Sequence, residues 1–600
     1  MRAACCVRKE ESSFLKERSK ELLPVWGGLL PITRDDLRHR IDQARGTNLA
    51  DLVIKNTRML DIATGEIART DIAICGDTIV GTYDLDYRGT AEIDGTAFFA
   101  VPGFIDTHVH PESTLVQPGE FDRLVLTRGT TTAIADPHEI ANVLGAPGIA
   151  YFIEAAGALA MDLRINLASC VPASPLETGG ATLDAAALVA LRGSPHVLGL
   201  AEFMNFPGVL AKNDDALDKL VAFADAPIDG HAPLLGGRDL NAYLSCGIRN
   251  CHESTSLPEA REKLRRGMQV LIRDGSVTRD IAALGPLIDM THAPFLGFCT
   301  DDRTPLHIVE HGHIDHLIRT AIAQGRDVAA TYRAATWSAA THFGLRDRGI
   351  IAPGRLADII LLHDLHACSV AQVIRAGRPV DEARFAARSL PAPVGYGSIK
   401  RAPVSAADFA VPCAGGSGPV IGIRHNQIVT DRLAMTLPYH GGARHPDVSQ
   451  DVAKVAVLER HGKSGSIGRG FVHGFGLARG AIASSIGHDA HNIIVVGQND
   501  ADMAVAVNRL IALQGGFVAA REGQVLAELA LPLAGLMSDR PAVEVEIRLR
   551  ELRAEVRKLG CMLHEPFVQM AFLPLSVIPH LKITDLGLVD VDRFEVIGLD

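Results

Sequence analysis

Hydrophobic and polar positions alternate in blocks through the middle of the chain. Between about residues 99 and 345, short apolar runs alternate with longer helix-like stretches such as 183–191 and 216–225. This order predicts parallel strands joined by crossover helices. The eight predicted strands cover residues 103–110, 131–136, 165–171, 197–203, 226–231, 247–252, 268–273 and 295–301. Eight such units match an α/β fold of the TIM-like (β/α)8 barrel type, which has a typical length of ~250 residues.

The segments on either side of the predicted barrel have a different pattern. Short apolar runs separated by glycine-containing turns occur at 51–54, 71–74 and 78–80, and similar runs recur at 357–362 and 373–379. Such runs are typical of β-strands joined by tight turns. We therefore expect a small β-sandwich domain built from both flanks, residues 48–98 and 346–395, with the barrel at 99–345 between them.

The two ends of the chain form further units. Residues 1–47 are charged and helix-prone, and we expect a helical extension with no catalytic role. After linkers containing Pro and Gly, apolar runs at 493–496, 516–518 and 543–547 predict strands, and the charged stretch 548–559 predicts a helix. Residues 396–600 are therefore expected to form an additional C-terminal α+β domain.

Composition narrows the class of protein. A formal net charge of -11 on 600 residues argues against a nucleic-acid or membrane partner held by electrostatics. No apolar run approaches the ~20 residues that span a bilayer, and no signal-peptide segment follows the basic N-terminus. Ten cysteines without paired spacing fit a reducing compartment. We expect a cytoplasmic enzyme.

The predicted barrel strands end in residues that bind metals. Strand periodicity places His108 and His110 on one side, and the carboxyl ends of barrel strands face the active site. Later strands end at Glu202, His231, His252 and Asp301. Each residue alone has an ordinary explanation, such as a buried histidine bonded to a carbonyl, but six of them at one rim favour a metal site.

The set divides into two divalent ions. His108, His110 and Asp301 would hold the first, His231 and His252 the second, and Glu202 would bridge both through its two oxygens. Two ions ~3.5–4 Å apart can share a water and lower its pKa toward neutrality. Imidazole and carboxylate ligands suit manganese, iron(II) or zinc, and the ligand types do not rank these.

Other residues near the ligands are candidates for catalysis or substrate binding. Asp136, His138 and Glu139 follow the second strand, although the same spacing is that of a capping box at a helix start. Glu112, Ser113 and Arg303 stand next to ligands in the sequence and could bind the substrate, although loop solvation explains them almost as well. In the last domain, His488 and His491 are expected to cover the barrel mouth and contact the substrate.

Longer segments around these residues resemble the amidohydrolase superfamily and, within it, the bacterial-type adenine deaminases. The matching segments are PGFIDTHVHPES at 102–113, DPHEIANVLG at 136–145, GLAEFMNFPG at 199–208, DGHAP at 229–233, CTDDR at 299–303, and residues 481–497 and 582–589. They are dispersed from about residue 50 to the C-terminus, which makes the resemblance specific.

The resemblance implies hydrolysis of adenine to hypoxanthine and ammonia, in purine salvage or adenine catabolism. A hydroxide bridging the metals would attack C6, and Asp301 would pass its proton toward the departing amine. Glu202 would bridge the metals, and Asp136, His138 or Glu139 would supply or position a second acid. Adenine is then the small-molecule partner, and we expect a homodimer or a higher homo-oligomer.

Two alternatives remain open. Another amidohydrolase reaction, such as cyclic amide hydrolysis or N-acyl deacylation, uses an overlapping ligand set, and the fold does not fix the substrate. A barrel that has lost its metals could act as a scaffold subunit, although a scaffold has no need for six converging ligands.

Overall fold

The structure, a computed structural model, describes residues 32–600. Most of the predicted N-terminal extension, residues 1–31, lies outside the described residues. The expectation that this segment is not a signal peptide is therefore not tested. The last part of the extension forms helix α2 (Arg34–Ala44). Thr33 and Asp36 form a capping box at the start of this helix, which satisfies backbone N–H groups that the first turn leaves free.

The first sheet contains strands from both sides of the barrel. Its order is β16-β15-β14-β5-β1-β2-β3, with β4 paired to β1. The strands are β1 (Ala50–Leu60), β2 (Ile67–Cys75), β3 (Thr78–Gly81), β4 (Gly89–Asp94), β5 (Phe99–Pro102), β14 (Ile359–Leu362), β15 (Val370–Arg375) and β16 (Arg378–Pro379). β5 and β14 pair antiparallel, with Val101 opposite Ile360. The sheet therefore joins segments that lie more than 250 residues apart in the sequence.

The eight predicted barrel strands are all present, in two parallel groups. β6 (Phe104–Val109), β7 (Thr130–Ala135), β8 (Asp162–Leu167), β9 (Val197–Phe203) and β10 (Ile228–Gly230) form one group, and β11 (Asn250–Cys251), β12 (Gln269–Arg273) and β13 (Leu296–Cys299) form the other. A parallel bridge between Val109 and Asp301 joins β6 to the end of β13. On the opposite side, the amide of Gly230 donates to Asn250 Oδ1 at 3.0 Å. The two groups thus curl into the expected TIM-like barrel.

Helices surround these strands. They are α3 (Pro118–Leu126), α4 (His138–Leu144), α5 (Ala146–Ala156), α6 (Ala185–Val189), α7 (Phe206–Leu210), α8 (Asp214–Ala222), α9 (Gly237–Ser245), α10 (Leu257–Arg265), α11 (Ile281–Leu284), α12 (Pro305–His311), α13 (Ile314–Ala323), α14 (Val328–Arg333) and α15 (Ala339–His342), followed by α16 (Glu382–Ala386). In the described part of the chain, no helix combines the length and apolarity that crossing a bilayer requires.

The C-terminal region is built on a second eight-stranded sheet, of order β19-β18-β23-β22-β25-β24-β26-β27. Its strands are β18 (Ser417–Ile423), β19 (Thr430–Thr436), β22 (Val452–Leu458), β23 (Ile467–His473), β24 (Ala481–Ser484), β25 (Ile493–Gly497), β26 (Gly516–Arg521) and β27 (Gln524–Ala530). α17 (Asp500–Leu513) and α18 (Ala542–Lys558) pack on this sheet. α19 (Pro566–Ala571) precedes a three-stranded antiparallel sheet of β28 (Leu581–Thr584), β29 (Gly587–Asp590) and β30 (Glu595–Ile597). The short strands β17 (Val411–Pro412), β20 (Tyr439–His440) and β21 (Ala443–Arg444) form a separate three-stranded sheet of order β17-β21-β20.

One predicted strand is wrong. Residues 543–547 were expected to be extended, but they form the first turns of α18. Val545 is fully buried, whereas Val543 and Ile547 are 60% and 51% exposed. Alternate residues of a strand would share one face, so this burial pattern follows the helical period, continuing to Leu549 and Leu552. The β-branched residues favour a strand locally, but packing of one helical face overrides that preference.

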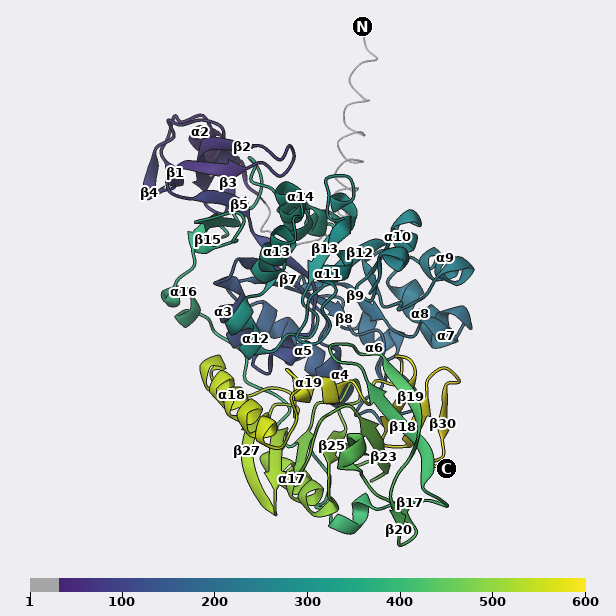
Figure 1. Ribbon diagram of the computed structural model, residues 1–600. Coiled ribbons are helices and arrows are strands. Elements are labelled where there is room, and N and C mark those ends of the chain that lie inside the picture. Colours follow the sequence, from purple (N-terminus) through teal and green to yellow (C-terminus); the bar gives the residue numbers. More distant parts are fainter. Residues whose placement is uncertain (1–31) are drawn as a thin grey trace.

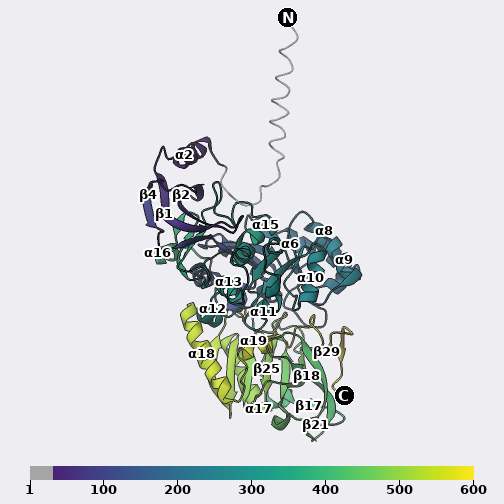
Figure 2. The same cartoon turned by 45° about the horizontal axis from the view of Figure 1, so that its top comes forward.

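The C-terminal region lies against the barrel on the side away from the first sheet (Figures 1 and 2). Backbone and side-chain hydrogen bonds cross this contact. The amide of Ser538 donates to Leu115 O at 2.8 Å, and the amide of Thr178 donates to Asp585 Oδ1 at 2.9 Å. A continuous hydrophobic core runs from the barrel into the C-terminal sheet. The domain boundaries expected from the sequence stay a prediction.

Candidate metal centre

The six predicted ligands converge at the carboxyl ends of the barrel strands. His108 and His110 come from the end of β6, Glu202 from β9, and His231 and His252 directly follow β10 and β11. Asp301 lies just past β13, where its amide donates to His108 O at 3.0 Å. None of the six is more than 5% exposed. Strands that lie up to about 190 residues apart therefore deliver their last side chains to one buried point.

Glu202 stands between two pairs of histidines. Its Oε1 lies 3.3 Å from His110 Nε2 and 3.6 Å from His108 Nε2. Its Oε2 lies 2.5 Å from His231 Nδ1 and 3.2 Å from His252 Nε2. Each oxygen thus faces one pair, which is the arrangement that a carboxylate bridging two cations requires.

Asp301 completes the first group. Its Oδ1 lies 3.1 Å from His110 Nε2 and 3.8 Å from His108 Nε2, and the two imidazole Nε2 atoms lie 3.1 Å apart. Nitrogen and carboxylate ligands at these separations surround a point rather than pairing off. Such donors, buried together, are the usual environment of a bound transition metal.

The two carboxylates of this cluster are in the ionised state that binding a cation requires. Against the effect of burial, the charges of His252 and His231 hold the pKa of Glu202 well below its usual range. Arg273 likewise holds the pKa of Asp301 well below its usual range despite burial. Both carboxylates are therefore anionic at neutral pH, the state in which they bind metals. His231 Nε2 and His252 Nδ1 are buried and have no hydrogen-bond partner among residues 32–600.

Two further residues of the centre escaped the sequence analysis. Arg273, the last residue of β12, donates from Nη1 to Asp301 Oδ2 at 2.8 Å and from Nη2 to Glu253 Oε2 at 3.0 Å. Glu253 Oε1 lies 3.4 Å from His252 Nε2. The signal was available, because Arg273 ends the seventh predicted strand and Glu253 directly follows a predicted ligand.

The segment after β7 enters the centre. Asp136 O lies 2.9 Å from His110 Nδ1, and Asp136 Oδ2 lies 3.1 Å from His138 Nδ1. His138 Nδ1 is also 3.5 Å from Glu202 Oε1. The alternative of a capping box is not realised, because Pro137 occupies the N-cap position of α4 and no side chain caps this helix. Asp136 instead holds two histidines of the cluster.

A group of acidic residues lies beside the ligands. Ser113 Oγ donates to Glu139 Oε1 at 2.8 Å and also hydrogen-bonds Asp302. Burial, with the nearby charges of Asp302 and Glu112, raises the pKa of Glu139 well above its usual range. Burial raises the pKa of Glu112 to about 7, and its Oε1 accepts from the amide of Ile140 at 3.1 Å. Burial among acidic groups therefore favours the protonated form of Glu139.

A loop of the C-terminal region reaches this group. His488 Nδ1 lies 3.8 Å from Glu139 Oε1, and its ring stacks on Phe572 with centroids 5.0 Å apart. Asp489 Oδ1 lies 3.8 Å from His138 Nε2. His491 is fully buried beside His488, with ring centroids 5.5 Å apart. The structure thus brings His488 to the centre, whereas His491 lies behind it.

Arg303 lies apart from the centre. Its Nε donates to Gly312 O at 2.9 Å and its Nη1 to Asp274 O at 2.6 Å. The side chain is buried in that network. Its expected contact with a substrate stays a prediction, and these bonds favour a structural role.

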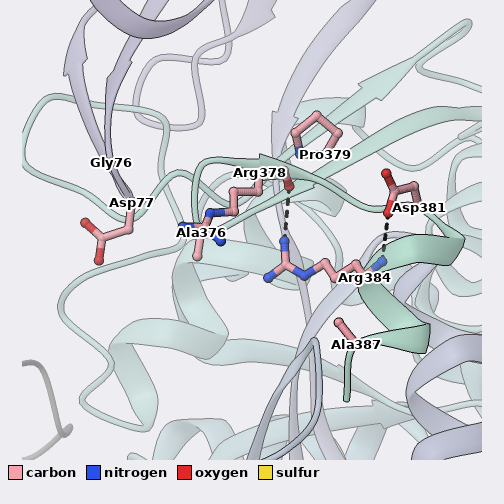
Figure 3. Close-up of a pocket in the computed structure, with 8 residues that line it drawn as sticks. All are labelled: Gly76, Asp77, Ala376, Arg378, Pro379, Asp381, Arg384 and Ala387. Atoms are coloured by element: carbon pink, nitrogen blue, oxygen red, sulfur yellow. Dashed lines mark hydrogen bonds between the residues drawn. The ribbon is translucent and has the colours of Figure 1, made fainter.

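A pocket at the edge of the first sheet is lined, within the described residues 32–600, by no histidine cluster like that of the candidate metal centre. Asp77, Arg378, Asp381 and Arg384 line it (Figure 3). The amide of Arg384 donates to Asp381 Oδ1 at 2.9 Å, and its Nη1 donates to Arg378 O at 3.3 Å. These bonds stay within the β16–α16 turn, so the pocket adds nothing to the candidate centre.

Comparison with known proteins finds relatives over nearly the whole chain. Residues 99–380 match the amidohydrolase family, and residues 427–595 match the adenine deaminase C-terminal domain. The adenine deaminase of Methylobacterium nodulans is 59% identical over 565 residues, which cover 94% of this chain and 100% of that protein. The adenine deaminase of Cereibacter sphaeroides is 57% identical, with coverage of 94% and 100%. That of Gluconobacter oxydans is 57% identical, with coverage of 92% and 98%.

Solved structures align more distantly. An adenosine deaminase from Xanthomonas campestris with bound zinc gives a TM-score of 0.42 at 18% identity, covering 57% of this chain and 97% of that one.

Proposed function

The chain belongs to the adenine deaminase family, and on this premise we propose that it hydrolyses adenine to hypoxanthine and ammonia at the centre described above. The observation that carries the proposal is the position of Glu202, whose two oxygens face separate pairs of histidines. This enzyme would act in adenine catabolism or purine salvage. No feature of the centre favours cyclic amide hydrolysis or a scaffold role.

The six ligands would hold two divalent ions, manganese or iron(II), with zinc also compatible. His108, His110 and Asp301 would bind one ion, His231 and His252 the other, and Glu202 both. When bound, such a pair lowers the pKa of a shared water and polarises the bond under attack. The remaining chemistry falls to the side chains around the ligands.

Asp301 would act as the proton shuttle. Arg273 occupies its Oδ2, so Oδ1 is left facing the histidines. Oδ1 would take a proton from the attacking water and return it to the amine that leaves C6. Arg273 thus orients the carboxylate without blocking the oxygen that reacts.

Glu139 would be the second acid. Burial beside other carboxyl groups raises its pKa and favours its protonated form, and it would donate to a purine ring nitrogen as C6 becomes tetrahedral. Ser113 orients its Oε1. Asp136 would position His138 and His110. The base would be surrounded by Glu112, Ser113, His138 and His488, and His491 would pack behind His488.

The rest of the organisation is proposed on the same basis. A small β domain of residues 48–98 and 346–395 would support the barrel of 99–345, and a C-terminal α+β domain of 396–600 would cover its mouth. The enzyme would work in the cytoplasm as a homodimer or a higher homo-oligomer, with adenine as its partner and neither nucleic acid nor membrane.

The test combines metal counting with turnover. Protein stripped of metal and reloaded with manganese should bind two ions per chain at the centre. It should release ammonia from adenine and should not open dihydroorotate-type rings. Glu202→Gln should lose bound manganese and lower kcat by more than about 10³-fold, because the bridging charge is gone. Glu66→Gln, at an exposed position directly before β2, is the control. Ring opening of a dihydroorotate-type cyclic amide, with no ammonia released from adenine, would overturn the proposal.

A further inference from the structure

A second group of histidines lies at the contact between the barrel and the C-terminal region. His307 and His311 are four positions apart on α12, so they share one face of the helix. His564 comes from the segment between α18 and α19. One nitrogen from each ring lies within 4.8 Å of the others. The proposed deamination uses none of the three.

The hydrogen bonds of His307 place its one lone pair on Nε2, where Arg279 occupies it. Its Nε2 lies 2.8 Å from Arg279 Nη2, and a guanidinium can only donate, so Nε2 must be the acceptor. The proton of the neutral ring is therefore on Nδ1, which lies 3.0 Å from Ser276 Oγ. A partner behind the ring is how metal-binding histidines are usually held. Ser276 thus fixes the tautomer of His307 with the lone pair on Nε2.

The position of Arg279 shows that this lone pair accepts a positive charge. The Arg279 residue is exposed, so its side chain can swing into solvent without leaving a buried charge. His307 is buried, whereas His311 and His564 reach the solvent. A cation therefore has both a path to the three rings and a competitor that can leave.

Burial and nearby arginines keep the three histidines uncharged, and the same arginines oppose a bound cation unless one of them leaves. Burial, followed by the positive charges of nearby arginines, lowers the pKa of each of the three histidines, so all have lone pairs at neutral pH. The carboxylates of Glu310 and Glu565 lie in the same contact. Arg550 and Arg553 bind Glu310 at 2.7 and 3.3 Å, and Glu565 pairs with Arg553. Asp274 lies 3.8 Å from His316, the next histidine along this surface.

We propose that His307, His311 and His564 bind one divalent cation of the zinc class, which displaces the Arg279 guanidinium and fastens α12 to the C-terminal region. Three imidazoles and one water complete the tetrahedral coordination that zinc prefers. α12 begins four residues after Asp301. The cation would therefore brace the barrel end that carries the candidate centre against the segment that covers it.

Counting zinc in matched variants tests the proposal. Full-length protein is stripped of metal, equilibrated with buffered zinc and analysed for zinc per chain. His311→Asn with His564→Asn should bind one zinc fewer than the wild type, whereas His39→Asn with His425→Asn, two exposed histidines elsewhere, should match it. Any zinc at the catalytic ligands is counted equally in all three proteins, so the difference reports this site alone.

Two further measurements keep the result interpretable. Zinc should raise the Tm of the wild type by a few degrees more than that of the double variant, because a ligand that binds only the folded state stabilises it. Arg279→Ala should tighten zinc binding several-fold, since the competing cation is gone. Equal zinc content in all proteins, or weaker binding after Arg279→Ala, would overturn the proposal. Equal Tm values without zinc show that the substitutions leave the fold intact.

Discussion

At the scale of single residues, the least expected feature of the centre is Arg273. It is buried between Glu253 and Asp301, and it is the cation that keeps these two carboxylates ionised in the absence of metal. Removing one partner of a buried ion network costs ~3–5 kcal/mol because the remaining charges lose their counter-ion. Arg273 therefore holds both the charge and the direction of the proposed proton shuttle.

Arg273→Met should lower kcat at least about 10²-fold and weaken manganese binding. Arg273→Lys should restore part of the manganese binding but little of kcat, because an ammonium group cannot hydrogen-bond both carboxylates as the guanidinium does. The assay is adenine turnover with metal titration. Arg348→Met, which breaks the buried pair with Asp162, is the control. It should lower stability and leave manganese affinity unchanged; equal metal loss in both variants would contradict this role for Arg273.

Lys582 gives a prediction about pH. It is fully buried, and it donates to Ile428 O at 2.6 Å and Phe572 O at 3.0 Å. Burial lowers its pKa from 10.5 to about 7. Between these values the unfolded chain holds a proton that the folded chain has lost, so this group makes stability rise with pH across that window, by at most ~1.4 kcal/mol per pH unit.

The comparison that isolates this effect is wild type against Lys582→Met, followed as Tm from pH 6 to pH 10. The Tm of the wild type should rise relative to that of the variant as pH increases above about 7. Below that pH the difference in Tm should stay constant. A difference that is flat across the whole range would mean that the amine stays protonated in the folded state.

At the scale of elements, the sequence pattern predicted all eight barrel strands and the residues that end them. Local patterning suffices there, because a buried parallel strand is a short apolar run and its last polar residue marks the rim. It failed at 543–547, where β-branched residues favour a strand and the helix is imposed by packing on β27. It also missed Glu253, because a carboxylate after a histidine looks like loop solvation until Arg273 is placed beside it.

Matched substitutions at α18 separate helix from strand. Val545→Thr should destabilise the protein by ~1–3 kcal/mol because it buries a hydroxyl in the core, and Val543→Thr should stay within ~0.5 kcal/mol because that side chain is exposed. Both replacements keep β-branching, so propensity is unchanged. The measurement is denaturant unfolding, and similar losses at both positions would indicate the shared face of a strand.

At the scale of the whole molecule, the C-terminal region forms one wall of the candidate centre. Sequence reasoning placed His488 there only from the expectation that a lid covers the barrel mouth, since contacts between residues 350 positions apart leave no periodic signal. Stacking on Phe572 holds the His488 ring, and Asp489 approaches His138. In the proposed enzyme, the barrel and this loop of the C-terminal region would build the substrate site together.

His488→Ala should lower kcat/KM about 10-fold or more by opening the site to water. His491→Ala should have a smaller effect, because that ring packs behind His488, and His425→Ala on the exposed surface should have none. Steady-state kinetics with adenine, measured for the three variants, test this ranking of kcat/KM. Wild-type kinetics in the first two variants would exclude the loop from the site.

The pairing of β5 with β14 has a consequence for biosynthesis. Val101 and its neighbours leave the ribosome roughly 260 residues before their partner at Ile360. At ~5–20 residues per second, the nascent chain carries an unpaired apolar edge for on the order of 10–50 seconds. During that interval a chaperone, or transient packing of the chain's own barrel helices on this edge, would be needed to prevent aggregation with other nascent chains on the polysome.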